Sequence, residues 1–376
     1  MITGSIRFLS SVMLLGISIY TNAQTKFPGW AYGPFIRPAT VNPVLSPDAK
    51  TFFPDPMSNK PVAWEASDVF NPAAVVKGNK IYVLYRSEDR SGEGIGQRTS
   101  RIGLAESADG IRMKRRPAPV LFPANDDQQE FEWPGGCEDP RVAVTEDGIF
   151  VMMYTQWNKK VPRLAVATSR DLINWKKHGP AFCKAFDGKF ADMFSKSASI
   201  VTRLVNGKQV IAKVNGKYMM YWGEKFMNIA TSDDLLNWSP TLDEKGELKL
   251  VLTPRLHYFD SELTECGPPA IITDKGILVM YNGKNLPGAS GDTNYTANTY
   301  AAGQALFNLK DPSKLIGRLD KPFFVPTEPF EKSGQYPAGT VFVEGLVFFK
   351  KKWFLYYGCA DSRVAVAVYD PNKRMP

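Results

Sequence analysis

The chain has few of the residues that bind metal ions. Its 376 residues include only two histidines, His178 and His257, and four widely spaced cysteines that form no CxxC pair. A zinc site needs a closely spaced set of such ligands. We therefore expect neither a metal site nor a cofactor. We interpret the cysteines as small buried thiols rather than as disulfide partners.

Long hydrophobic runs are lacking beyond the N-terminus. There, Arg7 precedes an apolar stretch from Phe8 to Tyr20, and the small residue Ala23 follows. Such a stretch is too short to span a bilayer and is typical of a secretory signal peptide. We predict a signal peptide at residues 1–23. The mature protein, residues 24–376, should be exported to the periplasm or the extracellular space without a membrane anchor.

Neither sign of charge dominates the sequence. The 46 basic and 38 acidic residues are interleaved, and the net charge is +8. The short basic runs at 114–116 and 350–352 stand beside expected turns, where solvated faces are commoner than nucleic-acid sites. We expect no nucleic-acid partner. The sequence gives no indication of the oligomeric state.

A hydrophobic segment that ends in or near tyrosine recurs five times along the chain. The copies are Ile81–Arg86, Ile149–Tyr154, Lys217–Trp222, Ile277–Tyr281 and Trp353–Gly358. Three of them continue into a second strand and a similar turn, as in Ala167-Thr-Ser-Arg-Asp171 and Ala230-Thr-Ser-Asp-Asp234. Repeats of several short strands and turns are typical of propeller blades. The sequence thus predicts an all-β fold, a single five-bladed β-propeller over residues 24–376.

The expected blades have recognisable beginnings. Each opens with a run that follows a polar or proline-containing turn; these runs are 71–76, 138–144, 196–201, 266–272 and 338–343. Tryptophans in the Asp-Leu-x-x-Trp turns should pack one blade against the next. The proline-rich segment 24–65 should form an arm that crosses the propeller and lends a strand that closes the ring.

Innermost strands of a propeller converge on its axis, so residues at their starts should meet at one mouth. Those residues are Asp68, Glu138, Asp139, Lys196, Glu262, Glu265 and Tyr336. Convergent carboxylates beside cations and aromatic rings suit cleavage of a glycosidic bond. That reaction needs one carboxyl to protonate the leaving oxygen and another to activate water or to attack.

The motifs at these positions resemble glycoside hydrolase family 130. The resemblance covers essentially the whole mature chain. It rests on Ser100–Ala105, Glu138-Asp-Pro-Arg141, Lys196-Ser-Ala198, Glu265-Cys-Gly-Pro-Pro269, Tyr281-Asn-Gly283 and Tyr357-Gly-Cys-Ala-Asp361. It implies a five-bladed propeller that acts on β-mannosides with inversion, β-1,2-linked mannosides in particular. Members of the family are phosphorylases or hydrolases.

The resemblance also implies residue roles. Asp139 would be the general acid, with its proton relayed through a mannose hydroxyl, and Glu224 or Glu265 would be the base. The expected mannose contacts are Asp68, Arg86, Arg101, Tyr281, Asn282 and Asp361. The cations Arg141, Arg163 and Lys196 are candidates for the same site or for an anion site.

The attacking group separates the two kinds of enzyme. Phosphorylases typically carry histidine where this chain has Asn282, and carboxylates at Glu224 and Glu265 would repel phosphate and activate water. We therefore predict an inverting β-mannosidase. A phosphorylase that produces mannose 1-phosphate, with phosphate bound by the three cations, remains the alternative enzyme. A non-catalytic glycan-binding propeller is the alternative outside enzymes.

Overall fold

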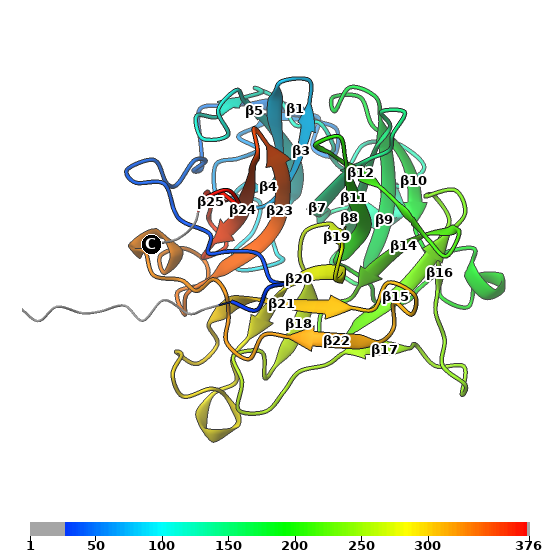
Figure 1. Cartoon of the computed structure of the whole chain (residues 1–376). Helices are drawn as coiled ribbons and strands as arrows, with labels where there is room; N and C mark the ends of the chain where they lie inside the picture. The colour runs from blue at the N-terminus through cyan, green and yellow to red at the C-terminus, as the bar shows by residue number, and fades with distance from the viewer. Residues whose placement is uncertain (1–26, 374–376) are drawn as a thin grey trace, which may run out of the picture.

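The computed structural model describes residues 27–373, which are almost entirely β-strands and turns (Figure 1). The predicted signal peptide, residues 1–23, lies outside the described residues. Helical structure in the described part is limited to α1 (Gln129–Glu132) and three short 3-10 turns. Within residues 27–373, no helix is both long and apolar enough to cross a membrane.

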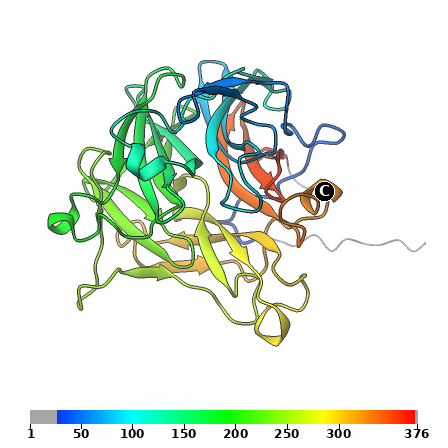
Figure 2. The same cartoon turned by 180° about the vertical axis from the view of Figure 1, so that it is seen from behind.

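Most strands form antiparallel meanders that follow one another along the chain (Figures 1 and 2). The first contains β3 (Asp68–Lys77), β4 (Lys80–Glu88), β5 (Ser100–Ser107) and β6 (Lys114–Arg115). The next contains β7 (Gly136–Val144), β8 (Phe150–Trp157), β9 (Pro162–Ser169) and β10 (Lys176–Pro180). It is followed by β11 (Ala198–Val205), β14 (Lys217–Trp222), β15 (Met227–Ser232) and β16 (Ser239–Pro240).

The remaining meanders complete the body. One contains β19 (Ala270–Thr273), β20 (Gly276–Lys284), β21 (Tyr300–Phe307) and β22 (Leu315–Arg318), with β18 (Leu263–Cys266) also paired to β20. The last contains β23 (Val341–Phe349), β24 (Lys352–Cys359) and β25 (Arg363–Tyr369). The shorter strands are β1 (Phe53–Asp55), β2 (Lys60–Val62), β12 (Lys208–Ile211), β13 (Lys213–Val214) and β17 (Leu250–Leu252).

The first strands of the meanders lie together at the centre. β3 packs beside β7 and β23, β7 contacts β11, and β11 pairs in parallel with β19. These are the runs that the sequence predicts to be innermost. The curled sheets confirm the expected nearly all-β, propeller-like arrangement, and the hydrophobic core is divided into clusters between neighbouring meanders.

The recurring turn has one hydrogen-bonding pattern. In the turn after β9, the Ser169 hydroxyl accepts the Leu172 amide, and the Asp171 carboxylate accepts two further backbone amides. The turn after β15 repeats these bonds, so the sequence similarity reflects a shared side-chain cap. As predicted, the tryptophans connect neighbours: Trp238 is buried in the cluster that contains Val151 and Leu164 of the preceding meander.

The proline-rich arm runs alongside the last meander. Ile36 forms an antiparallel bridge with Val368, and Leu45 forms one with Val364, both in β25. The Asn42 side chain exchanges two hydrogen bonds with the Val366 backbone between these bridges. The expected closing segment is therefore present as isolated bridges rather than as a regular strand.

The cysteines agree with their interpretation as thiols. All four are free, and Cys137, Cys266 and Cys359 are buried, whereas Cys183 is half-buried. Burial raises the pKa of the Cys137 and Cys359 thiols well above its ordinary value. They therefore act as small apolar residues of the core.

Candidate functional site

The backbone is irregular where the central strands begin. The pairing register breaks between Phe70 and Pro72 in β3, between Glu138 and Arg141 in β7, and between Val343 and Gly345 in β23. Asn71 and Asp139 at two of these bulges have positive φ angles of 45° and 48°. Such conformations are strained for residues other than glycine and cluster at functional sites. Bulges re-aim side chains, and here they bring polar groups together.

Arg86 organises one half of this cluster. Its guanidinium donates to Asp139 Oδ1 at 3.1 Å and to Glu138 Oε1 at 2.8 Å. It also donates to Glu88 at 2.7 Å. Asn71 Nδ2 donates to the same Asp139 oxygen at 2.9 Å. Because Arg86 is 6% exposed, these are buried contacts that hold Glu138 and Asp139 side by side.

Lys196 organises the other half. Its Nζ lies 3.8 Å from Asp139 Oδ2, 3.5 Å from Glu224 Oε1 and 3.9 Å from Glu265 Oε1. Ser197, which has a positive φ of 59°, donates a very short hydrogen bond from its hydroxyl to Glu265. The structure therefore brings the three predicted catalytic carboxylates, Asp139, Glu224 and Glu265, around one ammonium group.

The protonation states differ across the cluster. Burial raises the pKa of Glu138 to about 7, and Arg86 opposes this shift. Burial raises the pKa of Glu265 to about 7 as well, against the influence of Lys196. Burial would also raise the pKa of Asp139, but Arg86, Lys196 and Arg141 together hold it below its ordinary value. Below about pH 7 the Glu138–Asp139 pair therefore holds one proton, on Glu138, while Asp139 stays ionised.

Asp361 and Tyr300 border the cluster. Burial raises the pKa of Asp361 to about 7, and Arg86 opposes this shift. Burial raises the pKa of the Tyr300 phenol, and the carboxylate of Glu265 adds to the effect. Tyr300 packs edge-on against Tyr336, with ring centroids 5.3 Å apart. Tyr300 is therefore a neutral hydroxyl beside the carboxylates, with an aromatic surface behind it.

Several predicted site residues have other partners. Arg101 is buried and pairs with Asp55 and Asp89. Arg163 pairs with Asp192, whose side chain is 86% exposed. The Tyr281 hydroxyl donates to Asp260 at 2.7 Å. None of these contacts involves the Arg86–Lys196 cluster.

Three further predictions concern residues whose polar groups are already engaged. Asn282 exchanges two hydrogen bonds with the Val343 backbone and so joins β20 to β23. The Asp68 carboxylate accepts hydrogen bonds from Ser67, Ser362 and Arg98. Asn282 and Asp68 therefore support the site rather than present free groups. Arg141 lies beneath the cluster and donates to the backbone carbonyls of Asp139, Cys266 and Gly267.

Sequence reasoning missed several participants, namely Asn71, Glu88, Arg98, Ser197, Tyr300 and Glu344. Arg98 donates 2.7 Å hydrogen bonds to Asp68 and to Gln335. It thereby links the first meander to the segment that precedes the last meander. Its position in a glycine-rich loop carries no periodic signal. Asn71 precedes Pro72 and Glu344 precedes Gly345, both at strand bulges. A polar residue followed by proline or glycine inside a hydrophobic run was the sequence signal that could have indicated these bulges.

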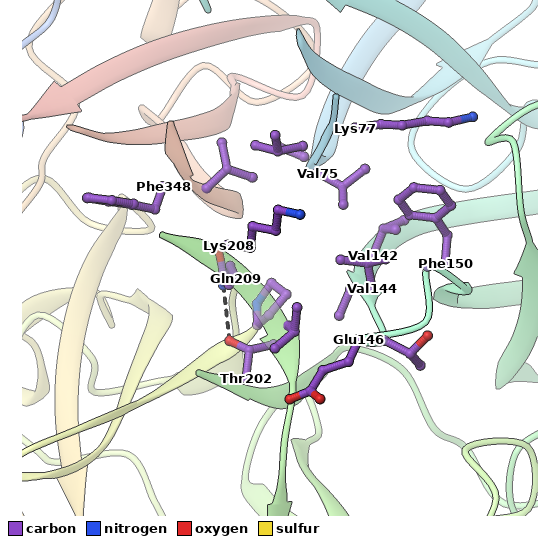
Figure 3. Close-up of a pocket in the computed structure, with 18 of the residues that line it drawn as sticks. Val75, Lys77, Val142, Val144, Glu146, Phe150, Thr202, Lys208, Gln209 and Phe348 are labelled. Atoms are coloured by element: carbon purple, nitrogen blue, oxygen red, sulfur yellow. Dashed lines mark hydrogen bonds between the residues drawn. The ribbon is translucent and has the colours of Figure 1, made fainter. Parts of the chain in front are cut away.

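A cavity of about 430 Å³ lies elsewhere, where the same central strands end (Figure 3). It is lined by residues such as Val75, Val142, Phe150 and Phe348, with Lys77 and Glu146 at its edge. None of its lining residues belongs to the carboxylate cluster, which lies where these strands begin. The cavity is therefore distinct from the candidate active site.

The cluster contains buried carboxyls that can donate and accept protons. Among residues 27–373, no group of three or more His, Cys, Asp and Glu side chains is arranged to hold a metal ion. The carboxyls of the cluster are separated instead by Arg86 and Lys196. Buried carboxyls whose environments set their pKa values apart are typical of enzymes that use general acid and base catalysis.

Comparisons with known proteins identify the family. The family model of glycoside hydrolase family 130, described as β-1,4-mannooligosaccharide phosphorylase, matches residues 40–375. A 1,2-β-oligomannan phosphorylase from Thermoanaerobacter sp. (strain X514) is 33% identical over 84% of this chain and 96% of its own length. The chain therefore belongs to glycoside hydrolase family 130, as its motifs predict.

Solved structures resemble the chain more closely. A glycosyl hydrolase from Bacteroides ovatus is 62% identical, with a TM-score of 0.91 over 93% of this chain and 97% of that one. Another structure is 59% identical, with a TM-score of 0.92 and the same shares covered. It comes from work on glycoside hydrolases, within this family of mannoside phosphorylases, that target β-1,2-mannosidic linkages in Candida mannan.

Proposed function

We propose that the protein is an exported, inverting hydrolase that releases mannose from β-1,2-linked mannosides. The observation that carries this proposal is the group of carboxylates around Lys196. Its ammonium lies within 4 Å of Asp139, Glu224 and Glu265. Arg86 already pairs with Glu88, Glu138 and Asp139, so Arg86 and Lys196 are two cations among five carboxyls. Two like charges 4 Å apart repel by roughly 4 kcal/mol at a protein surface, so this site disfavours a phosphate nucleophile and favours water.

The positions of the other cations support the same conclusion. Arg163 pairs with an exposed aspartate, and Arg141 donates to backbone carbonyls and contacts Glu344. These two residues and Lys196 therefore do not face one common space in which phosphate could bind. The 59% identical structure from the work on β-1,2-mannoside hydrolases supports the proposal further, because it covers 93% of this chain.

In this mechanism Glu138 and Asp139 act as one acid unit. Arg86 bridges their carboxyls, and one proton with a pKa of about 7 resides on Glu138 in the empty site. A bound sugar excludes water from the cluster, which favours the protonated form of a buried carboxyl. The proton passes from Glu138 to Asp139, and Asp139 donates it to a mannose hydroxyl while that hydroxyl gives its own proton to the leaving oxygen. Glu265 or Glu224 removes a proton from the attacking water.

The distances to Lys196 set an upper limit on the spacing of the carboxyls, and that limit falls within the range expected for inversion. Asp139 Oδ2 and Glu265 Oε1 both lie within 4 Å of Lys196 Nζ, so these two oxygens are at most about 8 Å apart. Inverting glycosidases hold their carboxyls roughly 6.5–9.5 Å apart to admit water. A relayed proton relaxes this requirement, since the acid need not touch the glycosidic oxygen.

We further propose that the meanders are the blades of a five-bladed propeller, with the arm bridged to β25 as part of the last blade. Residues 24–376 would then be one catalytic domain that follows a cleaved signal peptide. N-terminal sequencing of the exported protein would test the cleavage. A first residue other than Gln24 would contradict the predicted site.

The family leaves one specific alternative, a phosphorylase. The family description and the 33% identical relative both name phosphorylases. Incubation with β-1,2-mannobiose, with and without inorganic phosphate, separates the alternatives. We expect free mannose as the product at the same rate under both conditions. Accumulation of mannose 1-phosphate would overturn the hydrolase, and the lack of any turnover would favour a glycan-binding protein.

The pH dependence of hydrolysis should report the base. If Glu265 removes the proton from water, it must be ionised, and its pKa is raised to about 7 by burial. A base is active above its pKa, and the acid pair of Glu138 and Asp139 is active below its own pKa of about 7, so we expect kcat/KM to rise towards about pH 7 and to fall above it. Initial rates at substrate concentrations below KM provide the measurement. A profile that stays flat between about pH 5 and about pH 8 would exclude Glu265 as the base.

A further inference from the structure

The Arg141 guanidinium connects the backbones that carry the proposed acid and one proposed base. It donates to the carbonyl of Asp139 at 3.1 Å and to the carbonyl of Cys266, which follows Glu265, at 3.0 Å. A third, longer bond of 3.3 Å reaches the carbonyl of Gly267. Arg141 is 2% exposed, so water does not replace these bonds readily.

The backbone around Arg141 is packed too closely to admit side chains at two glycines. A Cβ atom on Gly267 would lie 2.8 Å from the Met280 carbonyl oxygen and 2.9 Å from that of Val343. A Cβ on Gly345 would lie 2.8 Å from the Pro72 carbonyl oxygen. The central strands thus pack backbone against backbone beside the bulges. The Asp139 carbonyl, which lies within the β7 bulge, is held by Arg141.

Glu344 lies next to Arg141 and has no role in the mechanism above. It is fully buried in the β23 bulge, and its Oε1 is 2.8 Å from Arg141 Nη2. Among residues 27–373, neither carboxyl oxygen of Glu344 has a well-aligned hydrogen bond. Burial raises the pKa of Glu344 well above its ordinary value, and Arg141 opposes this shift.

We propose that Arg141 and Glu344 are positioning residues: Arg141 sets the separation of the backbones at Asp139 and Glu265, and Glu344 holds the guanidinium in place. This inference rests on the proposed hydrolase. Lysine has one ammonium group and cannot reach the carbonyls of Asp139, Cys266 and Gly267 with the geometry of a guanidinium. Small displacements of catalytic groups reduce turnover strongly, whereas substrate contacts made elsewhere persist.

The test compares two matched substitutions. Arg37 is also a largely buried arginine that pairs with a buried glutamate, Glu331, and donates to a backbone carbonyl, that of Val325. These contacts join the arm to the segment between β22 and β23. We expect Arg141→Lys to lower kcat on β-1,2-mannobiose about 10²-fold with KM changed less than about threefold. Arg37→Lys should lower the melting temperature without lowering kcat.

A second pair of variants tests the inference independently, in case Arg141→Lys misfolds. Glu344→Gln keeps an oxygen for Arg141 and should retain kcat within about threefold, whereas Glu344→Met removes that acceptor at similar volume and should lower kcat more than about tenfold. Equal kcat values for Arg141→Lys and Arg37→Lys, or for the two Glu344 variants, would overturn the inference. Failure of the proposed hydrolase is seen separately, as a lack of mannose release by the wild-type protein.

Discussion

Replacing Asp139 by Asn should lower kcat on β-1,2-mannobiose by about 10²–10⁴-fold, the usual cost of losing a general acid. The amide has the shape of the carboxylate and can keep its contact with Arg86 or Asn71. It cannot deliver a proton. A mannoside with a highly activated aryl leaving group needs little protonation, so its hydrolysis should be affected much less.

Asp55→Asn is the matched control for this prediction. Asp55 is a buried aspartate that accepts a 2.7 Å hydrogen bond from Arg101, outside the catalytic cluster. Its replacement should reduce stability and leave kcat intact. If Asp139→Asn slows both substrates equally, Asp139 acts through the structure of the site and not as the acid.

The second large effect concerns the base, which is either Glu265 or Glu224. We expect Gln at the true base to lower kcat by about 10²–10⁴-fold, because the amide preserves shape and hydrogen bonding but cannot accept the proton of water. Glu265 is buried and accepts a hydrogen bond from Ser197, whereas the Glu224 side chain is 33% exposed. Steady-state rates of both variants on β-1,2-mannobiose identify which residue is the base.

Glu262→Gln provides the control for both variants. The side chain of Glu262 is also 33% exposed and pairs with Lys284 at 2.9 Å, so it tests the effect of removing a charge from a nearby ion pair. Its kcat should stay near that of the wild type. Near-normal rates for both Glu265→Gln and Glu224→Gln would contradict a base-assisted attack by water at this site.

The fold was predictable where one signal repeats. The tyrosine-ended strands and the Ser-x-Asp turns recur because the meanders share the same packing and the same turn caps. Ser169 and Ser232, for example, accept equivalent backbone amides in their turns. The arm was harder to define. Its prolines indicate irregular backbone, and the bridges at Ile36 and Leu45 depend on residues more than 300 positions away.

The site was predictable only for residues within recognisable motifs. Asp139 lies near the start of β7, Lys196 precedes β11, and Glu265 lies in β18 just before β19. The structure brings these three residues together with Glu224. Arg101 and Tyr281 also lie within family motifs, but Arg101 pairs with Asp89 and Tyr281 donates to Asp260 instead. A one-dimensional pattern shows which residue types recur, but not toward which neighbour each buried side chain turns.

The pairing of the arm with β25 has a consequence for how the protein is made. Ile36 and Leu45 are synthesised more than 300 residues before their partners Val368 and Val364. The arm therefore cannot dock until β25 has also been made. Contacts of such high sequence separation form slowly. Until they form, the edge of β25 stays unpaired and open to other chains, so the protein should be most prone to aggregation before the arm docks.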